Sequence, residues 1–168
     1  MKKSFKYYIK GNREIVQKAS QTLELCRILY NLCLEQRKFA WDNYRKSISR
    51  YDQIEELPSL KKFFPEFKEV PSQTLQEVVE RVDKTFQNFF SRVKKGEKPG
   101  YPRFKSFNRY DSFTLKQAGW KLVGKELRIN KIGSFKLFLS RPIEGEIKRK
   151  AQFLLNSRKR RGFLTNSV

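Results

Sequence analysis

The residues best suited to chemistry in this sequence are basic and aromatic side chains interleaved between Arg92 and Tyr110. That stretch holds seven Lys and Arg residues against a single acid, Glu97. Cations neutralise phosphates and flat rings stack on bases, so the mixture is typical of a surface that binds nucleic acid. Prolines at positions 99 and 102 stiffen the segment. We predict contact with an RNA or DNA backbone from Lys94, Lys95, Lys98, Tyr101, Arg103, Lys105 and Arg109.

The aromatic rings of this stretch have two interpretations. Tyr101 and Phe104 either stack on bases, or they tuck into the junction between helices and strands while the charges merely solvate the loop. The residue pattern alone does not separate the two.

The charge of the whole chain also indicates an anionic partner. Lys and Arg number 38 against 17 Asp and Glu in 168 residues, a formal net charge of +21, and such self-repulsion destabilises a compact protein. With 15 Phe and 38% hydrophobic residues, the chain is too rich in core formers for a disordered tail. No window approaches the roughly 18 apolar residues of a membrane span, and no apolar run follows the basic N-terminus. We therefore expect a cytoplasmic protein with no membrane partner.

Enzyme chemistry finds little support. There is no His, and the two cysteines, Cys26 and Cys33, lie seven apart in an apolar helical pattern, which favours buried thiols over a zinc site. No phosphate-binding glycine loop is present, and the carboxylates share no spacing that would hold two metal ions. We predict no catalytic residues, no metal, no cofactor and no small-molecule substrate.

The elements that must position the basic stretch begin with a short strand near residues 3–10 and a break at Gly11-Asn12, where Asn12 can cap a helix. Apolar residues then recur at helical spacing from Arg13 to about Lys46. One helix or two, broken near Trp41, fit this spacing equally well. Short helical pieces are expected over 47–70.

A second long helix is predicted after Pro71, with a capping box at Thr74–Glu77 and Ser72 as a competing cap. Its apolar stripe runs from Leu75 to Val93, and we expect it to pack against the first helix.

After Asp111 the apolar period shortens to two, which predicts short strands in a small antiparallel sheet that the N-terminal strand joins. Seven basic residues between Lys148 and Arg161 predict a loosely ordered basic tail. The fold class is α+β. We expect a first strand at 1–11, a helical lobe at 12–112 with its basic loop at 96–110, a β-meander at 113–150 and the tail at 151–168.

Four segments carry a family resemblance: Val70-Pro71-Ser72-Gln73-Thr74-Leu75-Gln76-Glu77-Val78-Val79, Lys84-Thr85-Phe86-Gln87-Asn88-Phe89-Phe90, Gly100-Tyr101-Pro102-Arg103-Phe104-Lys105-Ser106 and Cys26-Arg27-Ile28-Leu29-Tyr30-Asn31. Together they resemble the N-terminal half of the OrfB/TnpB family, insertion-sequence proteins that include RNA-guided DNA endonucleases. The resemblance covers about residues 1–147. It implies a wedge-like antiparallel β-barrel interrupted by a helical recognition lobe, with a guide RNA and a target DNA as partners.

The resemblance also implies contacts to a short DNA motif beside the target. Matched by motif, these fall on Ser72, Gln73, Gln76 and Thr114. A Gln side chain can read adenine through two hydrogen bonds in the major groove. The alternative interpretation is helix capping by Ser72 and ordinary surface solvation of the two Gln residues.

The departures from the family matter as much. Its RuvC-like nuclease domain, with three metal-binding acids, and its Cys-rich zinc element have no counterpart in this sequence. We therefore expect a truncated or frameshifted form that binds nucleic acid without cleaving it. The alternatives are a non-functional truncated remnant and a generic basic RNA-associated protein.

Overall fold

Residues 4–44 form a strand and one long helix. In this computed structural model, which describes residues 4–116, 119–140, 150–156 and 161–167, β1 (Ser4–Lys10) leads into α1 (Arg13–Tyr44). The predicted cap is confirmed, because the Asn12 side chain accepts a hydrogen bond of 2.8 Å from the Ile15 amide. The helix is not broken near Trp41; it ends at Arg45, whose φ of 52° is left-handed.

Short helices fill the connection between the two long ones, as predicted. They are α2 (Arg50–Glu55), α3 (Leu57–Phe63) and the 3₁₀ helix η1 (Pro65–Glu69). A capping box does occur here, between Ser49 and Asp52.

The capping box predicted for the second long helix is wrong. Helix α4 (Ser72–Lys94) starts directly after Pro71 and has no side-chain cap. Thr74 and Glu77 already lie inside the helix and are buried, so neither side chain is placed to cap its first turn.

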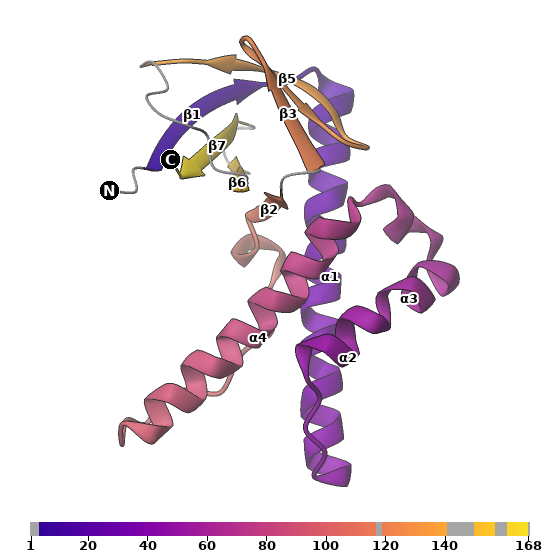
Figure 1. The fold of residues 1–168 in the computed structure, drawn as a ribbon, viewed down its shortest axis with the longest axis vertical. Coiled ribbons are helices and arrows are strands. Elements are labelled where there is room, and N and C mark those ends of the chain that lie inside the picture. Colours follow the sequence, from indigo (N-terminus) through magenta and orange to yellow (C-terminus); the bar gives the residue numbers. More distant parts are fainter. Residues whose placement is uncertain (1–3, 117–118, 141–149, 157–160, 168) are drawn as a thin grey trace.

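Helices α1 and α4 pack against each other at the end nearer the sheet and diverge toward the other (Figure 1). The apolar stripe of α4 is accordingly buried from Leu75 to Phe86, but Phe90 and Val93 are about half exposed. The predicted packing is thus correct for the first half of the stripe only. Cys26 and Cys33 are free, buried thiols, as expected.

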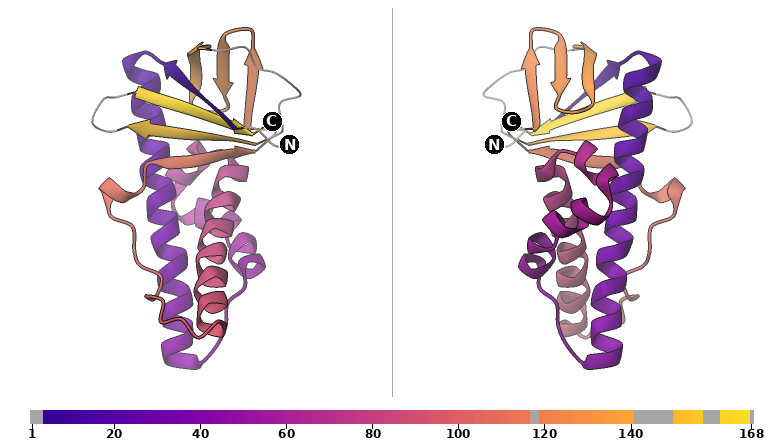
Figure 2. Two further views of the ribbon diagram at one scale, coloured as in Figure 1. Left: turned by 90° about the vertical axis from the view of Figure 1, so that its left-hand side faces the viewer. Right: turned by 90° about the vertical axis from the view of Figure 1, so that its right-hand side faces the viewer.

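A seven-stranded antiparallel sheet covers one end of the helices (Figure 2). Its order is β2-β6-β7-β1-β5-β4-β3, so the N-terminal strand joins it across the helical segment, as predicted. Besides β1, the strands are β2 (Ser112–Lys116), β3 (Trp120–Val123), β4 (Glu126–Ile129), β5 (Gly133–Phe138), β6 (Lys150–Asn156) and β7 (Arg161–Ser167).

The loosely ordered tail predicted for 151–168 is not what the structure has, because β6 and β7 lie in the middle of the sheet. Phe153 is fully buried and stacks on Phe113 of β2, with ring centroids 4.9 Å apart. The apolar residues on either side of the basic cluster belong to two strands, but they are consecutive in each strand (Phe153-Leu154-Leu155 and Phe163-Leu164) and so lack the alternation that predicts a strand.

The α+β class agrees with the structure, but the predicted closed barrel is not confirmed. Among the described residues no pairing joins the two edge strands, β2 and β3. The edges are nevertheless close at one corner, because only three residues separate Lys116 from Trp120 and the chain spans at most about 3.6 Å per residue. The sheet is therefore strongly curled and open.

The helices and the sheet share one hydrophobic core, and ion pairs and hydrogen bonds add to it where α4 meets β2. Lys116 of β2 contacts Glu80 at 2.7 Å and Glu77 at 3.5 Å, both on α4. Arg81 donates a hydrogen bond of 2.9 Å to the Ser112 carbonyl. None of the described helices combines the length and the apolar character that a membrane crossing requires.

Candidate nucleic-acid interface

The basic stretch leaves the far end of α4 and runs back along α1 to β2 (Figure 2). Its backbone is bonded to α1 at Lys105. The Asn31 side chain accepts from the Lys105 amide at 2.8 Å and donates to its carbonyl at 3.0 Å. Arg27 donates a second hydrogen bond to that carbonyl at 3.1 Å, while Glu24 binds the rest of the guanidinium. The loop is thus held to α1 without using its own charged side chains.

Most of the predicted backbone-binding cations face solvent. Lys94, Lys95, Lys98, Arg103 and Arg109 are all exposed, and in the described part of the chain none of them forms an ion pair. Lys105 is half-buried beside its anchor. The acid of this stretch, Glu97, pairs with Arg92, so it does not neutralise the predicted cations.

The rings divide between the two interpretations. Tyr101 meets Phe86 and Phe89 edge-on, with centroids 5.8 and 5.5 Å away, yet it keeps 44% of its surface exposed. Phe104 and Phe107 (in the 3₁₀ helix η2, Phe107–Arg109) are more than half exposed. Tyr110 is buried at the junction of helices and sheet, 5.9 Å from the Tyr30 ring.

Three of the four predicted DNA-motif residues lie at the other end of α4. Ser72 is exposed and binds the Lys61 ammonium at 2.6 Å, and Gln73 and Gln76 are half-buried. At a rise of 1.5 Å per residue, roughly 30 Å of helix separates Ser72 from Lys94.

The fourth residue, Thr114, is on β2 and follows Arg109 by only five residues. It keeps only 7% exposure, and its hydroxyl accepts a hydrogen bond from Arg81 at 3.3 Å. The two predicted sets are thus far apart along α4, and they approach each other only where the loop reaches β2.

Carboxylates near these residues bind cations of the protein itself. Arg37 is buried, with 8% exposure, and donates to Asp83 at 3.1 Å and to Gln53 at 2.8 Å. Glu77 and Glu80 contact Lys116. The described residues contain no group of three or more metal-ligating side chains.

An aromatic cavity that the sequence analysis did not predict lies between α1, α4 and the start of the loop. Its volume is about 260 Å³. The rings come from three segments far apart in sequence, so helical periodicity gave no sign that they meet. The residues that line it are Arg37, Trp41, Lys46, Ser47, Ile48, Phe86, Phe89, Phe90 and Tyr101.

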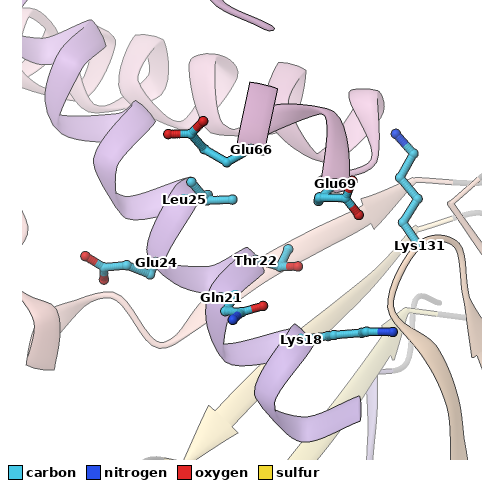
Figure 3. A pocket seen from close by; sticks show the side chains of 8 residues that line it. All are labelled: Lys18, Gln21, Thr22, Glu24, Leu25, Glu66, Glu69 and Lys131. Carbon is cyan, nitrogen blue, oxygen red and sulfur yellow. The ribbon is translucent and has the colours of Figure 1, made fainter. Parts of the chain in front are cut away.

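A second cavity, of about 460 Å³, lies between α1, η1 and the turn before β5 (Figure 3). Lys18 and Lys131 point into it, but so do Glu24, Glu66 and Glu69. Glu24 is paired with Arg27, Lys18 with Glu14, and the Lys131 ammonium donates to the Lys68 carbonyl. The lining therefore has no excess of positive charge to attract a phosphate backbone, and this cavity does not extend the interface.

Comparison with known proteins gives two matches. The helix-turn-helix domain of the OrfB_IS605 family matches residues 1–46. A Streptomyces pristinaespiralis protein named as an RNA-guided DNA endonuclease is 32% identical over 111 residues. The match covers 63% of this chain and 26% of that protein, so the chain spans about a quarter of the length of this relative.

The described part of residues 1–46 does not form a helix-turn-helix, although the matched domain has that name. Its described part contains β1 and the uninterrupted helix α1, and no turn divides α1 into two helices. The matches nevertheless confirm the resemblance, and they support a nucleic-acid-binding protein similar to TnpB.

Proposed function

We propose that this chain, whose N-terminal part is that of an OrfB/TnpB-family protein, binds a guide RNA and a target DNA and does not itself cleave nucleic acid. The proposal concerns recognition. The basic loop would hold phosphates of the RNA, and the start of α4 would face the DNA motif.

The observation that carries this proposal is the fastening of the basic loop at Lys105. Because Asn31 and Arg27 hold its backbone, the exposed cations on either side are presented at little further cost in conformational entropy. Each phosphate that they neutralise would release counterions, which makes the affinity strongly dependent on salt.

The carboxylates support the part of the proposal that concerns cleavage. A metal-dependent nuclease uses neighbouring carboxylates to hold two cations about 4 Å apart. Here Asp83, Glu77 and Glu80 contact Arg37 or Lys116. Such pairs neutralise the charge that a metal ion would need.

For the DNA motif, Gln76 is the residue with the best placement. It lies in the second turn of α4 with part of its side chain exposed, and an amide can bind adenine through two hydrogen bonds. Thr114 is the weakest of the four candidates, since reaching a base would require it to leave Arg81.

The test compares RNA transcribed from the end of the genetic element with a scrambled RNA of equal length. We expect tighter binding of the first RNA and a log–log salt slope that reflects several phosphates, at roughly −0.7 to −0.9 per contact. Equal affinities would instead favour a generic basic RNA-associated protein. Incubating the chain with target DNA and Mg²⁺ should yield no cut product, and cutting would overturn the proposal.

A further inference from the structure

The aromatic cavity where α1 and α4 diverge is not enclosed in the core, because several of the side chains that line it are exposed to solvent. Trp41, Phe90 and Tyr101 are 51%, 54% and 44% exposed, respectively. Rings of this size are normally buried, and a cluster of exposed ones marks a binding site. The neighbouring rings of Phe86 and Phe89 contact those of Phe90 and Tyr101, with centroids 5.3 to 6.3 Å apart.

The cavity has the size of a site for one flat ring system. At about 260 Å³ it lies just below the roughly 300–1,000 Å³ of pockets for drug-sized ligands. Rings from α1, α4 and the loop form its walls. A planar aromatic guest would therefore have π-faces or ring edges on several sides.

A cation also contributes to the wall of the cavity. Arg37 lines it, and the Arg37 guanidinium lies over the Phe86 ring, 5.3 Å from the ring centroid. A guanidinium offers a flat, charged surface on which a base can stack.

Cations surround the rim where a phosphate chain would enter and leave. Lys46 lines the cavity, and the Arg45 guanidinium lies 5.8 Å from the Trp41 ring centroid. Lys94 follows Phe90 by four residues, so both lie on one face of α4. Burial raises the pKa of Tyr101, and the negative charge of the Asp42 carboxylate near this rim raises it further. The phenol therefore stays neutral.

We propose that this cavity takes up one unpaired base of a single-stranded RNA, with the neighbouring phosphates on Arg45, Lys46 and Lys94. Recognition of unpaired RNA bases by stacking on aromatic side chains is the general mode for such strands. The assignment to RNA, rather than DNA, rests on the proposed function, in which RNA is the partner with unpaired bases.

The main experiment uses the full chain and a 12-nucleotide oligouridylate. The sequence has two tryptophans, Trp41 and Trp120, so Trp120→Phe leaves Trp41 as the sole indole reporter. Binding should quench Trp41 fluorescence, whereas polyphosphate of equal charge, which has no bases, should not. Equal quenching by both ligands overturns base uptake. If Trp120→Phe does not fold, the unaltered chain with an RNA containing one 2-aminopurine gives the same readout from the ligand.

Two matched substitutions test the site itself. Phe90→Ala should weaken oligouridylate binding by roughly 5- to 100-fold, the range for one stacked base. Phe63→Ala removes a ring that is 76% exposed on α3 and does not line the cavity, so it should change nothing. Similar losses in both variants overturn the proposal, and oligodeoxythymidylate binding as tightly as oligouridylate overturns the assignment to RNA. Failure here would not affect the preference for element RNA over scrambled RNA, which tests the proposed function separately.

Discussion

The side-chain amide of Asn31 forms two hydrogen bonds with the backbone of Lys105. Its oxygen accepts from the Lys105 N–H at 2.8 Å, and its nitrogen donates to the Lys105 carbonyl at 3.0 Å. An Asn side chain in this position acts like one rung of a strand pair, although it projects from a helix. It fixes the middle of the basic loop on α1, and the first two predictions concern that loop.

Replacing Asn31 by Ala should destabilise the protein by about 1–3 kcal/mol, because it removes two hydrogen bonds that each contribute roughly 0.5–1.5 kcal/mol net. RNA affinity should fall as well, since the loop must then be ordered on binding. Urea unfolding and RNA titration measure the two effects. Asn43→Ala is the matched control, because Asn43 bonds only the Phe39 carbonyl within α1. Equal behaviour of the two variants would contradict the anchoring role.

Changing Lys94, Lys95 and Lys98 together to Gln should make the log–log salt slope of RNA binding shallower, by roughly 0.7–0.9 for each phosphate that the loop no longer neutralises. The control changes Lys121, Lys125 and Lys136, which are exposed on the sheet, and alters the net charge equally. An equally shallow slope in the control would mean that the whole basic surface, and not the loop, binds the backbone.

The two cysteines should resist thiol reagents in the native protein. Burial raises the pKa of Cys26 and of Cys33 from 9.0 to about 12, so neither forms the reactive thiolate near pH 8. A colorimetric disulfide reagent should detect them only after urea is added. Rapid labelling of the native chain would show that α1 opens locally.

The same thiols should make stability fall in alkali. Their folded pKa values lie above the unfolded one, so above about pH 8.5 the unfolded chain loses protons that the native chain keeps. Burial raises the pKa of Tyr110 in the same direction. The contribution of these groups to the free energy of unfolding should therefore stay constant below about pH 8. It should decline as the pH rises through about 9 to 12. Replacing both cysteines with Ala should flatten part of that decline.

Asp83→Ala should lower the stability of the fold more than the double change Asp83→Ala and Arg37→Met, which also removes the charge of its partner, Arg37. Arg37 would remain buried without its carboxylate, and breaking such a pair from one side costs about 3–5 kcal/mol. Arg37→Met together with Asp83→Ala leaves no unpaired charge and should recover part of the loss. Thermal unfolding of the variants measures this, and a double variant less stable than Asp83→Ala would contradict it.

Local patterns predicted the elements well where one residue period continued over several turns. Asn12 marked the start of α1, the stripe from Leu75 to Phe86 marked the buried face of α4, and alternation after Asp111 marked β2 to β5. The basic residues of the candidate site could be named from their types. The separation of Lys94 from Ser72, Gln73 and Gln76 follows from the predicted length of α4, whereas the return of the loop along α1 to β2 could not be predicted without the fold.

What the sequence did not predict depends on contacts between distant segments. The meeting of Trp41, Phe90 and Tyr101 follows from the angle at which α1 and α4 diverge, and no local spacing encodes that angle. Phe153 gave no such signal either, because it is followed directly by Leu154 and Leu155, so apolar and polar residues do not alternate in its strand. Its burial depends on Phe113 and Phe135, which belong to other strands of the sheet.

The strand order has a consequence for synthesis on the ribosome. Strand β2 pairs only with β6 among the described strands, and β1 takes β7 as one of its two neighbours. The two long helices can meet once residue 94 has emerged, but β2 must wait for residues 150–156. During that interval the backbone N–H and C=O groups of β2 have no strand to pair with. The helical part is thus expected to form first, and the sheet to be the slow, aggregation-sensitive step of folding.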